Sequence, residues 1–155
     1  MSQRFATDIL IVGGGAAGLA AALHLADAYR VTLLSKGSME SGSSHWAQGG
    51  IAAVTDSFDS FECHERDTIT AGSGLCHLDT VKTVVESAPM VIKQLSQWGV
   101  DFDLSGNEYN LTKEGGHSQR RILHVADATG KAIIEVLTQK TLDHPNIDLF
   151  EDKVA

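Results

Sequence analysis

The composition of this 155-residue chain is that of a globular protein of one domain, with 43% hydrophobic and 21% charged residues. Twenty acidic against 12 basic residues give a formal net charge of −8, which excludes the basic surface that nucleic-acid binding or a polybasic membrane anchor requires. The uncharged stretch Ile9–Ala26 contains a glycine cluster that a membrane-spanning helix does not tolerate. We therefore predict a cytoplasmic protein that has neither nucleic acid nor a membrane as a partner.

The cysteines and histidines show no metal-binding pattern. Cys63 and Cys76 lie outside any CxxC pair, which predicts two buried thiols in a reducing compartment rather than a zinc site or a disulfide framework. No metal site is expected, and we interpret as structural the five histidines that lack an i, i+4 partner: His24, His64, His77, His124 and His144.

A strand–helix–strand unit is predicted within residues 1–36. Asp8–Val12 is an apolar run that stops at a glycine, which is typical of a strand buried on both faces. Apolar residues then recur at helical spacing from Leu19 to Ala26, and Arg30–Ser35 forms a second strand. Such a tight crossover joins parallel strands, so we predict an α/β fold with a parallel sheet.

The elements that follow are less regular. Residues 37–78 show little periodicity apart from a helix at Glu62–Ala71, and an irregular stretch of this length in a compact domain usually has a function. A helix is then predicted with Asp79 as its N-cap and Gly99 as its C-cap. Pro89 predicts a kink near Ser87 or a division into two helices.

The last third of the chain carries a polar loop, a helix and a strand. Gly115–Val125 is irregular, a helix capped by Asp127 or Thr129 follows, and Asn146–Phe150 reads as a strand. Because nothing after this strand closes a sheet, we expect the chain to be the N-terminal portion of a longer domain.

The strongest local motif is Gly13-Gly14-Gly15-Ala16-Ala17-Gly18, which fits GxGxxG between a strand and a helix. The first glycine permits a sharp turn, the second lets a pyrophosphate approach the backbone, and the third lets helix and strand pack closely. The helix N-terminus then presents N–H groups to the anion. At the end of the second strand, Ser35-Lys36 replaces the usual carboxylate, which argues against a simple NAD site.

Three further motifs carry a family resemblance: Ser41–Ala53 with its AQGGIAA, Leu111–Ser118 with its EGGHS, and Ala126–Gly130, which reads ADATG. Together they resemble the flavoprotein family of L-aspartate oxidases and the flavoprotein subunits of succinate dehydrogenase and fumarate reductase. The details are most similar to the L-aspartate oxidases. The resemblance implies a Rossmann-like FAD-binding domain, of which residues 1–155 are the N-terminal part without the capping domain.

The resemblance also implies non-covalent FAD. The members that attach the flavin covalently have a histidine five residues before the glutamine of AQGG, and here that position holds Ser43. Residues 37–78 would then be the flavin-contacting loop region, and residues 79–155 would supply helices, a substrate-side loop and a further strand. The residues expected to bind the cofactor are Gly13, Gly14, Gly15, Ala16, Ala17, Gly18, Ser35, Lys36, Ser43, Ser44, His45, Trp46, Ala47, Gln48, Gly49 and Gly50.

The implied reaction is the oxidation of L-aspartate to iminoaspartate, with hydride transfer to the flavin and oxygen or fumarate as the final acceptor. This is the first step toward quinolinate in NAD biosynthesis, which makes quinolinate synthase an expected partner. By resemblance, Glu114 lies near the substrate amine, where it pairs with the ammonium or helps remove its proton, and His117 binds a substrate carboxylate. The alternatives are a surface glutamate and a structural histidine. Arg120 and Arg121 either bind carboxylates or form salt bridges.

Two other functions stay open. One is a succinate dehydrogenase or fumarate reductase type of flavoprotein, and the other is a non-catalytic FAD- or NAD(P)-binding module. The 155-residue portion alone is expected to be inactive, because the catalytic Arg of the resembling family lies beyond its first 150 or so residues.

Overall fold

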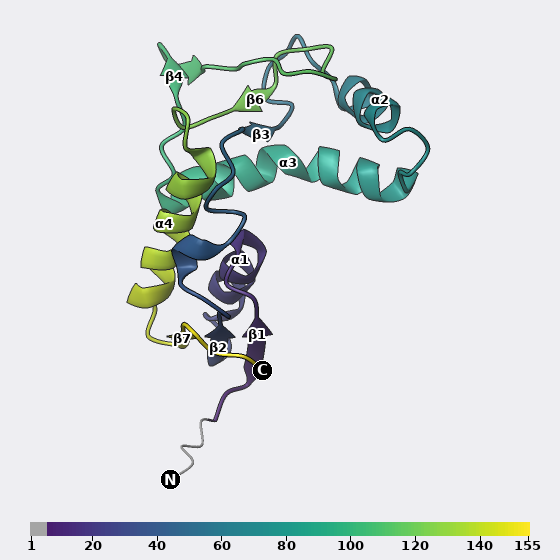
Figure 1. Ribbon diagram of the computed structural model, residues 1–155. Coiled ribbons are helices and arrows are strands. Elements are labelled where there is room, and N and C mark those ends of the chain that lie inside the picture. Colours follow the sequence, from purple (N-terminus) through teal and green to yellow (C-terminus); the bar gives the residue numbers. More distant parts are fainter. Residues whose placement is uncertain (1–5) are drawn as a thin grey trace. The chain divides into compact units, whose positions relative to one another are not determined.

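The structure is a computed structural model that describes residues 6–155. Its contacts divide the chain into two compact units (Figure 1). The first unit runs to Gln48 and resumes with Gly130–Ala155, and the second unit is Gly49–Thr129. The second unit is thus an insertion between two parts of the first.

The first unit is built on a parallel sheet of three strands, β1 (Ile9–Val12), β2 (Val31–Leu34) and β7 (Ile147–Phe150), in the order β1-β2-β7. Ile9 pairs with Val31 and Val31 pairs with Ile147, and both pairings are parallel. The predicted α/β class and the parallel crossover are confirmed.

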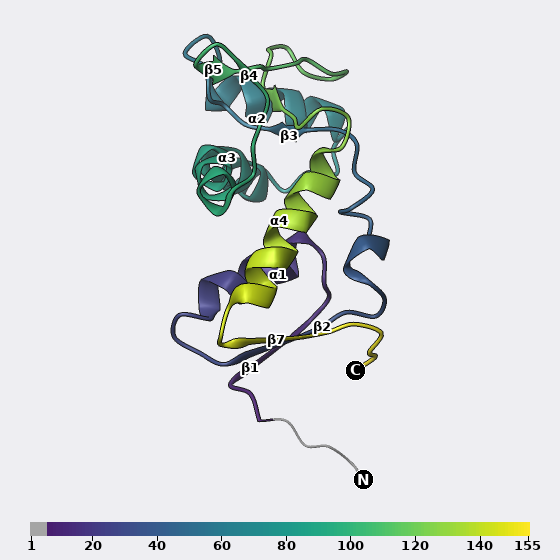
Figure 2. The ribbon, with the colours of Figure 1, turned by 90° about the vertical axis from the view of Figure 1, so that its left-hand side faces the viewer.

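Two helices cover one side of this sheet, α1 (Ala16–Leu25) and α4 (Thr129–Asp143) (Figures 1 and 2). A single-turn helix, η1 (Met39–Ser41), lies in the loop after β2. The core of the unit consists of small and branched apolar side chains on the two helices and on β2. Its most buried members include Leu19, Ala22, Ala26, Val31, Leu33, Ile134 and Leu137.

The expectation that the first strand is buried on both faces is wrong. Leu10 is 53% and Val12 is 65% exposed, while only the alternate residues of β1 are partly covered. β1 is the edge strand of the sheet and has a neighbouring strand on one side only, β2. β2, the central strand, has the burial on both faces that an apolar run indicates.

The second unit combines two helices with two short antiparallel strand pairs. Helix α2 (Phe61–Ala71) packs against α3 (Leu78–Trp98). Strand β3 (Ile51–Ala52) pairs with β6 (Ile122–Leu123), and β4 (Leu104–Ser105) pairs with β5 (Glu108–Tyr109). Its buried apolar residues are Ala53, Val85, Ile92, Leu95, Val100, Phe102, Ile122 and Leu123.

The helix ends correct one prediction and confirm another. Helix α3 has His77 rather than Asp79 at its N-cap. Asp79 lies in the first turn, where the negative charge of a carboxylate interacts favourably with the helix dipole. The helix continues through Pro89 and is not divided in two. Gly99 is confirmed as the C-cap, with φ of 110°. Helix α4 begins at Thr129, whose hydroxyl accepts a hydrogen bond from the Val125 N–H of the preceding turn.

Candidate functional site

The glycine-rich turn of the first unit connects β1 to α1 and cannot hold larger residues. Gly13 has φ of +123°, a conformation that strongly favours glycine, and its N–H donates to the Leu34 carbonyl at the end of β2. A Cβ on Gly14 would lie 2.8 Å from Met39 Sδ, and one on Gly18 would collide with the Gly13 carbonyl oxygen. The glycines therefore serve close packing of strand, turn and helix.

The N-terminus of α1 presents backbone N–H groups of the kind that bind anions. Its N-cap, Gly15, supplies no side-chain acceptor to the first N–H groups, which carry the partial positive charge of the helix dipole. Ala16 N–H is 3.5 Å from Ser44 Oγ, and a Cβ on Gly15 would come within 3.3 Å of the same oxygen. A glycine turn in front of these N–H groups, with only the long Ser44 contact at Ala16, fits a pyrophosphate, so the residues present suit the cofactor that the sequence predicts.

The predicted residues after β2 have different surroundings. Ser35 is buried and its backbone continues the sheet, with its N–H donating to Phe150 and its carbonyl accepting from Lys153. Lys36 is exposed. In the segment 43–48, the Trp46 side chain is 71% exposed and meets the His45 ring edge-on at 5.4 Å.

Gly130 is a close-packing residue that the list of predicted cofactor-binding positions omits. Its N–H donates to the Ala47 carbonyl at 2.9 Å. A Cβ there would collide with the Ser44 carbonyl oxygen and lie 2.7 Å from that of Ala47. The first turn of α4 therefore fixes the backbone of the predicted cofactor-binding segment. The ADATG motif contains this glycine, but its partner 83 positions earlier cannot be read from the motif.

Gly49 and Gly50 belong to the second unit and differ in role. A Cβ on Gly50 would collide with the Leu123 carbonyl oxygen of β6. The packing of β3 against β6 is therefore sufficient to explain the glycine at this position. Gly49 is exposed, and a Cβ on it would lie 3.7 Å from Glu114 Oε1. The carboxylate of the EGGHS loop thus lies against the backbone of Gly49.

A buried ion cluster lies at the centre of the second unit. Arg121 is 0% exposed. Its Nε and Nη2 donate to the two oxygens of Asp59 at 2.6 and 2.8 Å, and its Nη1 donates to Asp67 Oδ2 at 2.6 Å. This is the bidentate geometry that Arg and carboxylates prefer. The hydrogen bonds that Arg121 donates to Asp59 chiefly raise the pKa of Arg121, against the opposing effect of burial. Of the two alternatives for Arg121, the structure shows the salt bridge.

The EGGHS loop is anchored to this cluster. Ser118 donates from both N and Oγ to Asp67 Oδ2, each at 2.7 Å. His117 Nδ1 lies 3.2 Å from Arg121 Nη1. Burial acts to raise the pKa of Asp67, but the hydrogen bonds from Ser118 and Arg121 outweigh it and hold that pKa well below its usual range. The end of the loop is therefore fixed by charged groups, while Glu114 is exposed.

His64 is a buried neighbour of the loop. It is 6% exposed, its ring lies 5.8 Å from that of His117, and its Nδ1 has no hydrogen-bond partner among residues 6–155. Burial, together with the positive charge of Arg121, lowers the pKa of His64.

The cysteines are free and half-buried rather than fully buried. Cys63 Sγ is 3.1 Å from Ser118 Oγ and 3.3 Å from Arg66 Nη2, so it contacts the edge of the anchored loop. Within residues 6–155 there is no group of three or more His, Cys, Asp or Glu placed to hold a metal ion. No helix in that range is long and apolar enough to cross a membrane.

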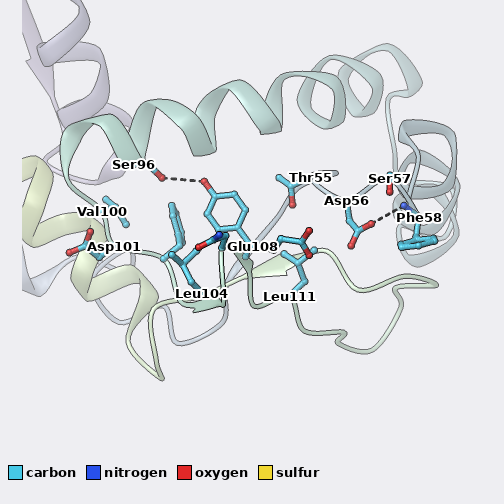
Figure 3. A pocket seen from close by; sticks show the side chains of 13 residues that line it. Thr55, Asp56, Ser57, Phe58, Ser96, Val100, Asp101, Leu104, Glu108 and Leu111 are labelled. Carbon is cyan, nitrogen blue, oxygen red and sulfur yellow. Dashed lines mark hydrogen bonds between the residues drawn. The ribbon is translucent and has the colours of Figure 1, made fainter.

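An open pocket of about 640 Å³ lies elsewhere in the second unit (Figure 3). It lies beside α3 and the β4–β5 pair, where Ser96 Oγ is 3.5 Å from Tyr109 Oη. None of the residues that line it is a predicted site residue. The chemistry expected from the motifs is therefore not concentrated at this pocket.

The parallel β-α-β unit with a glycine turn and an uncapped helix N-terminus defines a dinucleotide-binding α/β protein. A family model described as "FAD binding domain" matches residues 8–155. The chain belongs to this family of FAD-binding domains, and FAD is the cofactor. The similarity expected from the motifs is confirmed.

Relatives and solved structures agree with this assignment. An L-aspartate oxidase of Pseudomonas aeruginosa is 48% identical over 100% of this chain, and one of Yersinia pestis is 48% identical over 97%. FrdA of E. coli quinol fumarate reductase, in a mutant form, superposes with a TM-score of 0.91 at 36% identity over 97% of the chain. Sdh1 of Mycobacterium smegmatis has a TM-score of 0.90 at 27% identity over 97%. The chain spans 30% and 29% of the two oxidases, 26% of FrdA and 28% of Sdh1.

Proposed function

We propose that the protein containing this chain oxidises L-aspartate to iminoaspartate. The observation that carries the proposal is the placement of the Glu114 carboxylate against Gly49, in a loop anchored by the buried Arg121 cluster. An exposed carboxylate beside the AQGG backbone suits a substrate that carries an ammonium group. The similarity to proteins named L-aspartate oxidase over the full chain supports the same substrate.

The bound FAD would supply the acceptor for the hydride that leaves the substrate Cα. In the first unit, the backbone N–H groups at the start of α1 would bind the pyrophosphate. In the second unit, Glu114 would hold the substrate ammonium and accept a proton from it, because loss of hydride requires a neutral amine. His117 would donate a hydrogen bond to a substrate carboxylate. Ser43 stands where the covalently attaching members have a histidine, so FAD would be held non-covalently.

The remaining steps of the proposal concern the cellular context. Oxygen or fumarate would reoxidise the protein, and the product would feed quinolinate formation on the route to NAD. Quinolinate synthase is then the proposed partner and the cytoplasm the proposed location. Because the chain spans about 30% of its relatives, the 155 residues alone are expected not to turn over substrate.

The test uses the full-length protein with Glu114→Gln. We expect aspartate turnover to fall about 10²–10⁴-fold, the usual contribution of a positioned acid or base, while the visible flavin spectrum is retained. Glu108→Gln is the matched control, because Glu108 is an exposed carboxylate on β5 of the same unit. Iminoaspartate is followed as oxaloacetate after hydrolysis. Flavin that stays with the protein on acid precipitation would contradict non-covalent binding.

The second candidate is a succinate- or fumarate-converting flavoprotein, which the superposition on FrdA and Sdh1 favours. The same preparation distinguishes the two functions. Turnover of succinate without turnover of aspartate would overturn our proposal, and flavin binding with neither turnover would indicate a non-catalytic module.

A further inference from the structure

The contact between Arg121 and His117 determines where the imidazole proton lies. A guanidinium group has only donors and no acceptor. Arg121 Nη1 lies 3.2 Å from His117 Nδ1, so this nitrogen must present its lone pair to form the hydrogen bond. A neutral imidazole has a single N–H, and the proton is then on Nε2.

With Nδ1 facing Arg121, the Nε2–H is the donor that His117 has for a ligand. The residue is half-buried. The His117 N–H donates to the Glu114 carbonyl at 3.3 Å, so the two residues stand on one turn of the loop. An N–H donor and a carboxylate acceptor on one turn are complementary to a molecule with both a carboxylate and an ammonium group, such as an α-amino acid.

We infer that Arg121 is a positioning residue, which holds His117 in the Nε2–H tautomer and thereby offers a hydrogen-bond donor to a carboxylate of an amino-acid substrate. The tautomer part stands on this geometry alone, and the substrate part rests on the proposed function.

The cluster holds Arg121 rigidly enough for this role. Asp59 binds Nε and Nη2 as a fork, which fixes the plane of the guanidinium and directs Nη1 to Asp67 and His117. Asp67 also binds Ser118, the residue after His117. Asp67 therefore accepts hydrogen bonds both from Arg121, which orients the His117 ring, and from Ser118, which anchors the loop.

The first test reads the tautomer directly. In the full-length protein labelled with ¹⁵N-histidine, the imidazole nitrogen shifts distinguish a protonated Nε2 from a protonated Nδ1, and His117→Gln identifies the resonances. We expect His117 to be protonated at Nε2 without added substrate. A proton on Nδ1, or an equal mixture of tautomers, would overturn the inference.

The second test separates positioning from mere stability. Arg121→Lys keeps the charge but loses the fork, so we expect the KM for aspartate to rise about tenfold or more, as for the loss of one charge-assisted hydrogen bond. We expect kcat to change less, and a second His117 tautomer to appear. Lys82→Arg is the control, since exposed Lys82 lies on α3 of the same unit and pairs with Glu86, outside the proposed site. An unchanged KM with lowered thermal stability would show a purely structural role.

A rescue makes the second test sharper. A glutamine amide is a donor in any state, so adding His117→Gln to Arg121→Lys should lower the KM again if the missing donor is the cause. Failure of the double variant to improve KM would contradict the inference. If wild-type protein does not turn over aspartate, the proposed function fails, while the ¹⁵N experiment still decides the role of Arg121. If Arg121→Lys does not fold, the ¹⁵N experiment on the wild-type protein still decides whether Arg121 sets the tautomer of His117.

Discussion

The two compact units use opposite means to prepare a polar site. In the first unit the proposed binding groups are backbone N–H groups at the start of α1, and the buried polar residues are uncharged: Thr32, Ser35 and Thr141. In the second unit a fully buried arginine and two carboxylates orient a loop. A glycine turn can bind a phosphate through its backbone, whereas a side-chain donor must be oriented by other side chains.

The substitution with the largest expected effect on stability removes Arg121 from the charge cluster of the second unit. Arg121→Met leaves Asp59 and Asp67 without their shared cation, and removing one partner of a buried ion pair costs about 3–5 kcal/mol of the free energy of unfolding. Urea denaturation measures this cost. Arg120→Met, on the exposed neighbour, should change stability by less than about 0.5 kcal/mol. Adding Asp59→Asn should restore part of the loss, and equal stability of wild type and Arg121→Met would show that the cluster is not stabilising.

The next largest loss of stability is expected when a closely packed glycine of the first unit is replaced. Gly18→Ala places a methyl group on the Gly13 carbonyl oxygen, so we expect a loss of about 1–3 kcal/mol in unfolding free energy and loss of bound flavin. Gly42→Ala is the matched control, because Gly42 has φ of −77° and nothing lies within 4 Å of the position of its Cβ. Flavin content of the purified proteins is read from the visible spectrum. Full flavin content in Gly18→Ala would contradict the proposal that the glycine turn between β1 and α1 binds the cofactor.

A smaller effect is expected where the loop joins the cluster. Ser118→Ala removes one of the two hydrogen bonds that Ser118 gives Asp67, which should cost about 1 kcal/mol in chemical denaturation. Ser105→Ala, at an exposed position of β4, provides the comparison. A loss as large as that of Arg121→Met would mean that the hydroxyl, and not the guanidinium, holds the loop.

The smallest effect is a dependence of stability on pH. The pKa of His64 is lowered from 6.5 in the folded protein, so the unfolded state binds more protons below that pH and stability falls as the solution is acidified. One such group gives a slope of at most about 1.4 kcal/mol per pH unit. Asp59 and Asp67, whose pKa values are also lowered, add a further loss only below about pH 4.

Urea midpoints between pH 7 and pH 5 measure the histidine contribution. His64→Gln should flatten this part of the curve. A wild-type midpoint that does not vary between these pH values would contradict burial of a neutral His64.

Sequence alone determined the βαβ unit, because its strands, glycines and helix follow one another within 30 residues and each has a local physical requirement. The same holds for the helix at 61–71 and the cap at Gly99. The family resemblance came from motifs that are likewise continuous in the chain. These features depend on spacing, which a sequence displays directly.

Only the tertiary structure decided the partners of Arg121. Asp59 lies 62 positions and Asp67 lies 54 positions before it, and no periodicity connects an arginine in a polar loop with those carboxylates. The exposure of β1 was decided in the same way, by which strands and helices pack beside it. Burial and charge pairing depend on where distant segments meet in space, which is the information that local patterns do not contain.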